Sequence, residues 1–382
     1  MRSQGKTKAI IIGGGIGGIT TAIALRRVGI DATVYERAPE LQEVGSAIPL
    51  FTNALKALQK LGLGDKIKAL GESANALTLS TWRGRVLTDV TNEKHLKKLG
   101  TVSIVVHRAE LLALLVETLG MENVQLGADC TGFSQDQSGV CVRFANGMEA
   151  KGDFLVGADG LHSIIRSQAF GISKPAYVGY TCWRGVAHIQ RAGLERYVWG
   201  KGHQFGIAPM TKGRAYWFAQ KYAPEGERDK AVGRKQELLD LFHDWHDPVP
   251  AVIEATAEAD ILRNDVYELK HLKRWSDGRV TLLGDAAHAM TPNLGQGGCL
   301  AIEDALALAA CIAEEPDVVA ALKMYESRRI KRTSNVARLA HVMGRAVQIE
   351  NNMVAGARNA IIQRVPASFV IKRVLWILDY EV

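Results

Sequence analysis

Short apolar runs alternate with helical periodicity through the first third of the chain. Residues 9–12 form a β-branched run, which is typical of a strand buried on both faces, and residues 19–28 continue with a helical pattern. A second strand is predicted at 32–35. A helix beginning at Arg108 is predicted from leucines that recur every three to four positions. This alternation predicts a doubly wound α/β domain.

The pattern changes between residues 176 and 277. Segments 180–186, 204–209 and 215–220 are short, rich in aromatic residues and bounded by glycine or proline. Such segments are typical of an antiparallel sheet. Segment 77–88 is predicted to add strands to the same sheet.

These changes divide the chain into six consecutive segments. Three belong to the α/β domain: 1–75, 101–175 and 278–345. Two belong to the β-sheet domain, which we expect to bind the substrate: 76–100 and 176–277. The last is a predicted C-terminal helical tail, 346–382.

A glycine-rich turn lies between the first predicted strand and its helix. Gly13, Gly15 and Gly18 fit the G-x-G-x-x-G fingerprint, whose glycines permit a tight turn, approach of a pyrophosphate, and close packing of helix and strand. The helix N-terminus offers free N–H groups to that phosphate. Glu36, at the end of the second strand, can accept hydrogen bonds from the ribose of an adenosine. Together they predict a dinucleotide site, although a signal peptide or a structural turn would also place glycines here.

Two later strands end in acidic turns. Residues 152–160 form an apolar strand that enters an Asp159-Gly160 turn, and Arg166 follows it. Residues 279–283 form another buried strand, which ends at Gly284-Asp285. A glycine-rich segment and a long helical pattern from 299 to about 313 come next.

The order of these motifs resembles that of a known family. The glycine fingerprint, G-A-D-G-x-x-S-x-x-R and G-D-A-A-H-x-x-x-P-x-x-G-Q-G occur in sequence over about residues 7 to 340. This order resembles the single-component FAD-dependent aromatic hydroxylases, the class A flavoprotein monooxygenases. Strings 179–185 and 292–304 are especially similar to the urate hydroxylase and zeaxanthin epoxidase branches of that family.

The resemblance implies a fold and an activity. The fold is a doubly wound, Rossmann-like FAD-binding domain interleaved with an antiparallel β-sheet substrate domain. FAD is the implied cofactor, NADPH or NADH the transient electron donor, and O2 the co-substrate. The implied reaction hydroxylates or epoxidises a small aromatic or apolar substrate through a flavin C4a-hydroperoxide.

The resemblance also implies which residues contact FAD. Asp285 is expected to bind the ribityl hydroxyls, and the turn after 295 to direct N–H groups at the flavin, where a helix N-terminus stabilises negative charge. Arg108 is expected to reach the pyrophosphate, although a solvated residue at a helix start would look the same. Arg166 could pair with Asp159 and simply brace the turn. The expected FAD-binding set is Gly13, Gly15, Gly18, Glu36, Arg37, Ser46, Ala47, Arg108, Cys130, Asp159, Asp285, Pro292, Gly295, Gln296, Gly297, Gly298 and Cys299.

Three members of this set carry qualifications. Arg37 lies over the adenine or points to solvent. Cys130 follows a predicted strand at 124–127 and its turn, and is expected to contact the adenine through its backbone. Ser46 belongs to a loop that approaches the flavin, but relatives often have another small residue there.

Two residues of the β-sheet domain are candidates for substrate binding. Relatives resembling urate hydroxylase place an arginine near Gln204 for the anionic substrate and an aromatic hydroxyl at Tyr216. Because glutamine cannot pair with an anion as arginine does, we expect a neutral, apolar or phenolic substrate. Tyr216 would equally suit the core. His288 is expected to be a packed, hydrogen-bonded residue, and no catalytic residue is assigned.

Composition and charge limit the partners. The 382 residues carry a net charge of +7, but no basic block dominates the first three quarters, so no nucleic-acid partner is expected. The five cysteines are widely spaced without a C-x-x-C pair, which argues against disulfides and metal and favours the cytoplasm. No apolar run reaches the ~18 residues of a membrane span. The basic, amphipathic stretch 356–382 either docks on the FAD domain or makes weak contact with a membrane surface. The sequence carries no signal of oligomeric state.

Two rival functions share the flavin motifs. One is another type of FAD enzyme, a reductase or a halogenase, although the chain lacks the W-x-W pair of flavin halogenases. The other is a flavin-binding scaffold with little turnover. Bleaching of the flavin by NADPH or NADH separates an enzyme from a scaffold, and a product that gains one oxygen atom separates a hydroxylase from a reductase.

Overall fold

The first layer of the fold is a six-stranded sheet with the order β18-β19-β12-β1-β2-β8. The structure is a computed structural model, and it describes residues 6–41, 46–74, 78–90, 101–171, 174–189 and 196–382. Five strands of this sheet are parallel, and only the edge strand β18 is antiparallel, which confirms the predicted α/β class. The strands are β1 Lys8–Ile12, β2 Asp31–Tyr35, β8 Val124–Gln125, β12 Phe154–Gly157, β18 Ser276–Asp277 and β19 Val280–Leu282.

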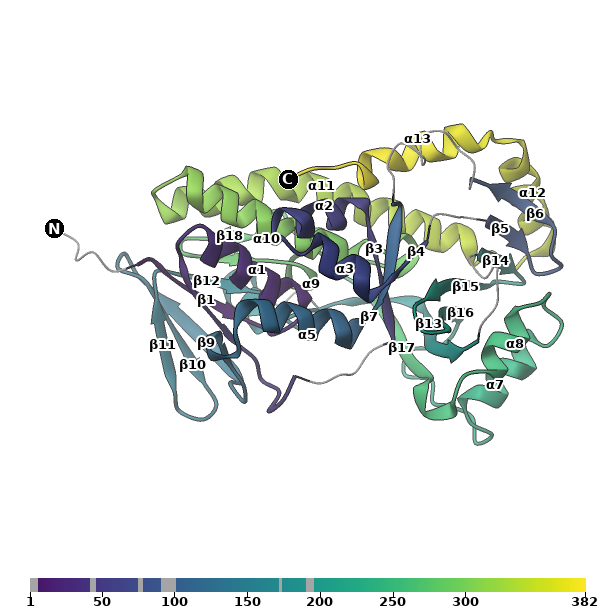
Figure 1. The fold of residues 1–382 in the computed structure, drawn as a ribbon, viewed down its shortest axis with the longest axis horizontal. Coiled ribbons are helices and arrows are strands. Elements are labelled where there is room, and N and C mark those ends of the chain that lie inside the picture. The colour runs from purple at the N-terminus through teal and green to yellow at the C-terminus, as the bar shows by residue number, and fades with distance from the viewer. Residues whose placement is uncertain (1–5, 42–45, 75–77, 91–100, 172–173, 190–195) are drawn as a thin grey trace.

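Helices cover this sheet, and the long pair α10 and α11 crosses the molecule (Figure 1). Helix α1 packs against both α5 and α10, and α10 against α11. Helix α1 begins at Ile16, earlier than the predicted start at 19, because Gly15 is extended and caps the helix. The helices of this domain are α1 Ile16–Arg27, α2 Thr52–Lys60, α3 Gly64–Leu70, α5 Arg108–Leu119, α6 Ile164–Phe170, α9 Asp285–His288, α10 Gly297–Glu314 and α11 Val318–Val347, with 3-10 turns η1 Met121–Asn123 and η3 Pro292–Leu294.

Two small antiparallel sheets were not predicted from the sequence. One, with the order β11-β10-β9, projects from the end of the molecule near the N-terminus (Figure 1). Cys130 begins β9, so it lies at the start of this sheet. The other has the order β3-β7-β4 and lies beside α2 and α3. Their strands are β9 Cys130–Gln135, β10 Val140–Phe144, β11 Glu149–Gly152, β3 Ala47–Phe51, β4 Glu72–Ala74 and β7 Ser103–His107.

The β-sheet domain contains a seven-stranded sheet with the order β17-β13-β16-β15-β14-β5-β6. As predicted, the segment around 77–88 supplies two of its strands, β5 and β6, although β5 pairs in parallel with β14. One face of the sheet buries tryptophan and phenylalanine side chains against α7 and α8. The elements are β5 Thr78–Thr81, β6 Val86–Asp89, β13 Ala176–His188, β14 Arg196–Gly200, β15 His203–Met210, β16 Arg214–Tyr222, β17 Leu262–Glu268, α7 Arg234–Phe242, α8 Val249–Glu254 and the turn η2 Glu258–Asp260.

The C-terminal tail forms two helices, α12 (Asn352–Arg364) and α13 (Ala367–Leu378), separated by Pro366. Helix α12 packs against β6, and α13 lies along the helical layer near α2 (Figure 1). Three residues of α13 are buried, whereas α12 buries none completely. Among the residues that the structure describes, no helix combines the length and the apolar character that a membrane crossing requires.

Candidate active site

Four parallel strands end at one edge of the first sheet, and each ends in a glycine or an acid of the predicted motifs. Strand β1 leads into Gly13, β2 into Glu36, β12 into Asp159 and β19 into Asp285. The turns are joined by backbone hydrogen bonds, such as the one that Gly13 N–H donates to the Tyr35 carbonyl at 2.9 Å. Ligands of open α/β sheets bind at this carboxyl edge, so the four motifs surround one site.

The three fingerprint glycines have different surroundings. A Cβ on Gly13, whose φ is +112°, would lie 2.3 Å from the Ala158 carbonyl oxygen, and a Cβ on Gly18 would lie 1.9 Å from the Gly13 carbonyl oxygen. A Cβ on Gly15 would meet no atom of the described residues within 4 Å. Gly13 and Gly18 therefore allow backbone segments to touch. Gly15 borders open space at the N-terminus of α1, where a pyrophosphate can be accommodated.

Glu36 fixes the shape of the glycine turn. Its Oε2 accepts a hydrogen bond from Gly14 N–H at 2.6 Å, and its Oε1 accepts one from Ala38 N–H at 3.0 Å. Each carboxylate oxygen can accept a second hydrogen bond, so capacity for a ribose hydroxyl remains. Arg37 beside it is exposed.

The Asp159 turn is braced from two sides. Asp159 Oδ2 accepts hydrogen bonds from two backbone N–H groups of α6 at 2.8 and 3.2 Å, while its Oδ1 is buried without a partner. Burial raises the pKa of Asp159, although the hydrogen bonds from Ser163 and the backbone oppose this shift. Arg166 donates to the carbonyls of Leu161 and Ala286, at 2.7 and 2.9 Å, and so ties this turn to the Gly-Asp turn.

Asp285 is exposed at this edge of the sheet. Within residues 281–289 it alone is exposed. Its Oδ1 is the sole atom, at 3.8 Å, that a Cβ on Gly297 would meet. Arg108 is exposed, but nearby protein atoms partly remove water from its guanidinium group. This desolvation and the charge of Arg184 lower the pKa of Arg108, whereas the charge of Asp285 raises it. Arg108, Asp285 and Gly297 therefore lie close together. The surface that these residues form with Gly15 at the sheet edge is called the groove below.

The segment before α10 approaches strand β3 closely. Pro292 is exposed at the start of η3, and Gly295 has a φ of +62°. A Cβ on Gly298 would lie 2.5 Å from Ile48 Cδ1, which follows Ala47 in β3. These glycines leave the first N–H groups of α10 beside the groove.

Two cysteines of the expected set are buried thiols. Burial raises the pKa of Cys130 to about 11 and that of Cys299 to about 12. Cys299 Sγ accepts a hydrogen bond from Phe51 N–H at 3.5 Å and donates to the Pro49 carbonyl at 3.6 Å. Its side chain therefore fastens α10 to β3, and contact with a cofactor would come through its backbone.

A cluster of buried charges, which was not predicted from the sequence, lies behind the groove. Arg329 contacts Glu303 and Asp304 at 2.7 Å each, and all three side chains are fully buried. Asp304 Oδ2 also accepts hydrogen bonds from Gly284 N–H at 3.2 Å and from His288 Nε2 at 2.6 Å. Two adjacent acids in an otherwise apolar helix were the available signal, because buried carboxylates need partners.

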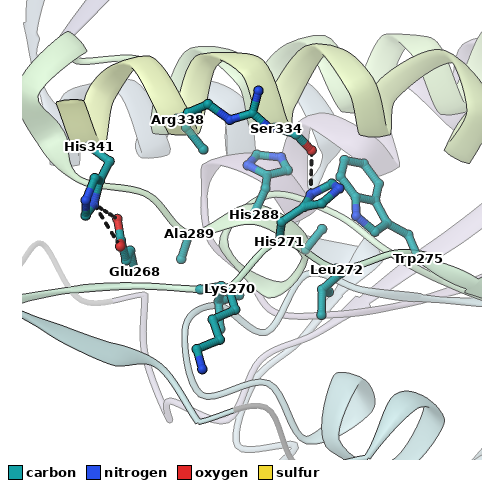
Figure 2. A pocket seen from close by; sticks show the side chains of 13 residues that line it. Glu268, Lys270, His271, Leu272, Trp275, His288, Ala289, Ser334, Arg338 and His341 are labelled. Atoms are coloured by element: carbon teal, nitrogen blue, oxygen red, sulfur yellow. Dashed lines mark hydrogen bonds and ion pairs between the residues drawn. The ribbon is translucent and has the colours of Figure 1, made fainter. Parts of the chain in front are cut away.

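His288 is packed and hydrogen-bonded, as expected, and it forms part of a second cavity of about 240 Å3 (Figure 2). In this cavity His271 faces Ser334, and His341 faces Glu268. None of the described residues that line the cavity belongs to the expected FAD-binding or substrate-binding set. The cavity is therefore distinct from the groove.

The face of the seven-stranded sheet opposite α7 and α8 forms a regular grid of side chains. Residues directly opposite each other in antiparallel strands share a face. The registers of β13, β16 and β15 give three rows on this face: Cys182, Gln220 and Gln204; Arg184, Phe218 and Gly206; Val186, Tyr216 and Ala208. Arg184 is the only charged residue among the nine.

The grid meets the FAD-binding domain at Tyr216. Tyr216 and Ala47 of β3 pack against the same small cluster of Ala74, Val105 and Met210. The Tyr216 hydroxyl is hydrogen-bonded to Ser46, and burial holds the pKa of Tyr216 well above its usual value. Gln204 and Gln220 are 3% and 1% exposed, and within the described part of the chain Gln204 Oε1 and Gln220 Nε2 have no hydrogen-bond partner. Both predicted substrate residues thus lie on one face of the sheet, and only Gln204 has a polar atom free.

The groove fits FAD. The open side of Gly15 suits a phosphate, and the exposed Asp285 carboxylate suits hydroxyl groups. Buried polar atoms without partners, Asp159 Oδ1 and Gln296 Nε2, belong to turns of the same sheet edge.

Comparisons with known proteins agree with this geometry. A family model described as "FAD binding domain" matches residues 6–340. An aurachin C monooxygenase/isomerase from Stigmatella aurantiaca is 40% identical over 93% of both chains. An FAD-dependent urate hydroxylase from Klebsiella pneumoniae is 35% identical over 86% of this chain and 87% of its own. The structure of Klebsiella pneumoniae HpxO complexed with FAD and uric acid superposes with a TM-score of 0.91 at 31% identity, over 97% and 96% of the two chains.

These similarities favour a monooxygenase over the rival reductase, halogenase and scaffold functions. They cover both domains, so they extend beyond the nucleotide-binding turn that many flavoproteins share. The cofactor is therefore FAD, with NAD(P)H as the electron donor typical of the family. The chain belongs to the single-component, FAD-dependent aromatic hydroxylases, the class A flavoprotein monooxygenases.

Proposed function

We propose that this monooxygenase acts on a neutral aromatic or apolar substrate that presents a hydrogen-bond donor beside an acceptor. The observation that carries the proposal is the grid of nine side chains, of which only Arg184 is charged. The Arg184 guanidinium already donates to Asn264 Oδ1 at 2.5 Å. Arg184 Nε has no partner among the described residues, but Arg184 lies in the neighbouring row. The row of Cys182, Gln220 and Gln204 carries no charge, so removing a substrate anion from water between the two amides would be costly.

The amide pair sets the polar edge of the substrate. Gln220 Oε1 accepts a hydrogen bond from Asn293 Nδ2 at 3.2 Å, which leaves Gln220 Nε2 as a free donor. Gln204, directly opposite in the sheet, has Oε1 as a free acceptor. A buried amide atom without a partner disfavours a purely apolar ligand at that point. A lactam, hydroxyl or similar neutral group satisfies both atoms.

Different residues of the sheet edge would bind different parts of FAD. In this proposal the pyrophosphate lies at Gly15 and α1 with Arg108 nearby, the adenosine ribose at Glu36, and the ribityl chain at Asp285. The N–H groups of residues 297–298 face the ring. Bound FAD, reduced by NAD(P)H, activates O2 and supplies one oxygen atom to the substrate. The protein orients the substrate against the grid and excludes water.

The relatives give first candidates for the substrate. Aurachin C is the named substrate of the enzyme that is 40% identical, and urate that of the 35% identical hydroxylases. Gln204 in place of an arginine favours the first over the second. We expect aurachin C to accelerate NAD(P)H oxidation and to gain one oxygen atom, whereas urate should release mainly hydrogen peroxide or have no effect.

The experiment measures NAD(P)H oxidation, peroxide release and product mass with aurachin C, urate and salicylate. Gln204→Arg should weaken binding of a neutral substrate at least about tenfold, a loss of about 1.4 kcal/mol, and raise the response to anions. Gln236→Arg, on the exposed surface of α7, is the matched control and should change nothing. A wild-type enzyme that oxygenates only anions, with Gln204→Arg inactive on them, contradicts the proposed substrate class.

We also propose that the enzyme works in the cytoplasm and that its tail makes weak contact with anionic membrane surfaces. Met353, Ile361 and Phe369 are 85%, 63% and 50% exposed on α12 and α13. Exposed basic residues accompany them on the same two helices, and no acidic residue occurs between 351 and 378. An exposed apolar stripe with positive charge is typical of an interfacial helix, and a membrane would supply an apolar substrate.

Vesicle sedimentation tests the membrane contact. The protein should sediment with vesicles of phosphatidylcholine and phosphatidylglycerol but not with phosphatidylcholine alone. The Ile361→Ser, Phe369→Ser double variant should lose this binding. Val232→Ser, which changes a side chain 60% exposed in the β-sheet domain, should retain it. Equal sedimentation of all variants, or concentration-dependent self-association through the same face, overturns this part of the proposal.

A further inference from the structure

The side-chain amide of Gln296 is held in one orientation at the start of α10. Gln296 is 1% exposed, and its Oε1 accepts a hydrogen bond from Asn53 Nδ2 at 3.0 Å. Its Nε2 has no hydrogen-bond partner among the residues that the structure describes. Gln296 Nε2 is therefore a buried hydrogen-bond donor without an acceptor, and it lies directly before the glycines that border the groove. Such a donor is costly unless a ligand accepts from it.

Glu303 imposes this orientation through Asn53. Asn53 Nδ2 also donates to Glu303 Oε1, at 2.6 Å. An ionised carboxylate can only accept hydrogen bonds, so the NH2 end of Asn53 must face Glu303. The same NH2 group then also faces Gln296 and requires its oxygen. The NH2 end of Gln296 is thereby turned away from Asn53.

The C-terminal helix anchors this series of contacts. Arg332 binds Glu303 with both ends of its guanidinium fork, at 2.7 Å each. The same fork donates to the carbonyls of Trp376 and Ile377 in α13, at 3.1 and 2.9 Å. The ring of Tyr380 lies 3.6 Å from the guanidinium carbon. A bidentate pair fixes the direction of the carboxylate more strictly than a single contact does.

We propose that Gln296 Nε2 donates a hydrogen bond to the carbonyl edge of the bound flavin. Arg332, Glu303 and Asn53 are positioning residues that hold it in the donating orientation. This proposal rests on the proposed placement of the flavin at the start of α10. A donor at that edge stabilises reduced flavin, which carries negative charge there, more than oxidised flavin. The series of contacts therefore raises the reduction potential of the flavin.

The test measures the two-electron potential by dye equilibration and the FAD affinity of the apoprotein by fluorescence quenching. Gln296→Met removes the donor, and Asn53→Leu frees the orientation of Gln296. Each should weaken the binding of reduced FAD relative to oxidised FAD about tenfold, which lowers the potential by about 30 mV. Because Asn53 acts through Gln296, the double variant should show the same shift as Gln296→Met alone.

Arg332→Lys keeps the charge but loses the fork, and it should lower the potential in the same direction. Arg328→Lys is the matched control on the same helix, where Arg328 pairs with Glu314 on the surface, and it should have no effect. Additive shifts in the double variant, or an unchanged potential in Gln296→Met, overturn the proposal. If the potential is unchanged while FAD binding and oxygenation persist, this inference fails and the proposed function stands. A wild-type chain that binds no FAD overturns both.

Discussion

The same substitution at two glycines of the fingerprint should have opposite consequences. Gly15→Ala should leave the apoprotein stable and weaken FAD binding, whereas Gly18→Ala should destabilise the fold itself. Gly15 has φ −76° and ψ 178°, which alanine adopts without strain, and a Cβ there meets nothing within 4 Å. At Gly18 a Cβ would lie 1.9 Å from the carbonyl oxygen of Gly13.

The magnitudes follow from these surroundings. At Gly15 alanine reduces the entropy of the unfolded chain but is a poorer N-cap, so the apoprotein should change by less than about 1 kcal/mol. The new methyl group occupies the space proposed for the pyrophosphate, and we expect at least about tenfold weaker FAD binding, or 1.4 kcal/mol. At Gly18 helix α1 must move away from β1, and overpacking of this kind costs about 3 kcal/mol or more.

Thermal unfolding of the apoproteins and FAD titration separate the two effects. Gly18→Ala should lower Tm by roughly 3–6 °C without FAD, and Gly15→Ala by less than about 1 °C. Added FAD should raise the Tm of the wild type more than that of Gly15→Ala, because a ligand stabilises in proportion to its affinity. Equal losses of apoprotein stability, or wild-type FAD affinity in Gly15→Ala, would refute the assignment of these glycines.

Three further predictions concern the core. Burial alone would raise the pKa of Asp304, but the charge of Arg329 lowers it by more, so the pKa of Asp304 lies below its usual value of 3.8. Its stabilising effect is present above that pH and is lost as the pH falls through the folded-state pKa, so Asp304→Asn should flatten the acid-unfolding curve below about pH 4. Trp217→Phe removes the 2.8 Å hydrogen bond from Nε1 to Thr256 Oγ1 and should cost about 2 kcal/mol in urea unfolding. Burial raises the pKa of three thiols to about 11 or 12, so a thiol reagent at pH 8 should label the partly exposed Cys141 first.

The elements that the sequence predicted are those whose burial follows from local pattern. Strand β1 is buried on both faces in a parallel sheet, so it appears as a short β-branched run. Strand β2 alternates buried and half-buried residues, with Ala32 and Val34 on the buried face. The aromatic segments of the β-sheet domain alternate because one face packs on α7 and α8. The glycine turn was predictable because its steric requirements are local to one strand–helix unit.

The missed features depend on contacts between distant residues. Strand β10 alternates Val140, Val142 and Phe144, but its partners β9 and β11 mix polar residues and glycines with the apolar ones, so no local pattern predicted a sheet. The pairing of Gln204 with Gln220 requires the register of β15 and β16, which turn lengths and side-chain packing determine together. Gln204 could therefore be predicted from the sequence, but its pairing with Gln220 could not.

The buried charges behind the groove orient the amides of Asn53 and Gln296 more than they stabilise the fold. Replacing a buried ion pair by apolar residues of similar size is often neutral or stabilising, so Glu303 and Arg332 are not required to fill the core. An apolar residue at 303 would pack equally well, but it would leave the Asn53 amide free to rotate, and Gln296 with it. Only an acceptor that cannot donate determines which end of Asn53 faces it. If this reasoning is correct, stability and flavin potential will separate. An apolar replacement of Glu303 and Arg332 also removes one of the two carboxylates that pair with Arg329, so it will unfold more easily than wild type, whereas Asn53→Leu keeps all of these charges. Both variants will nevertheless shift the potential by the same amount.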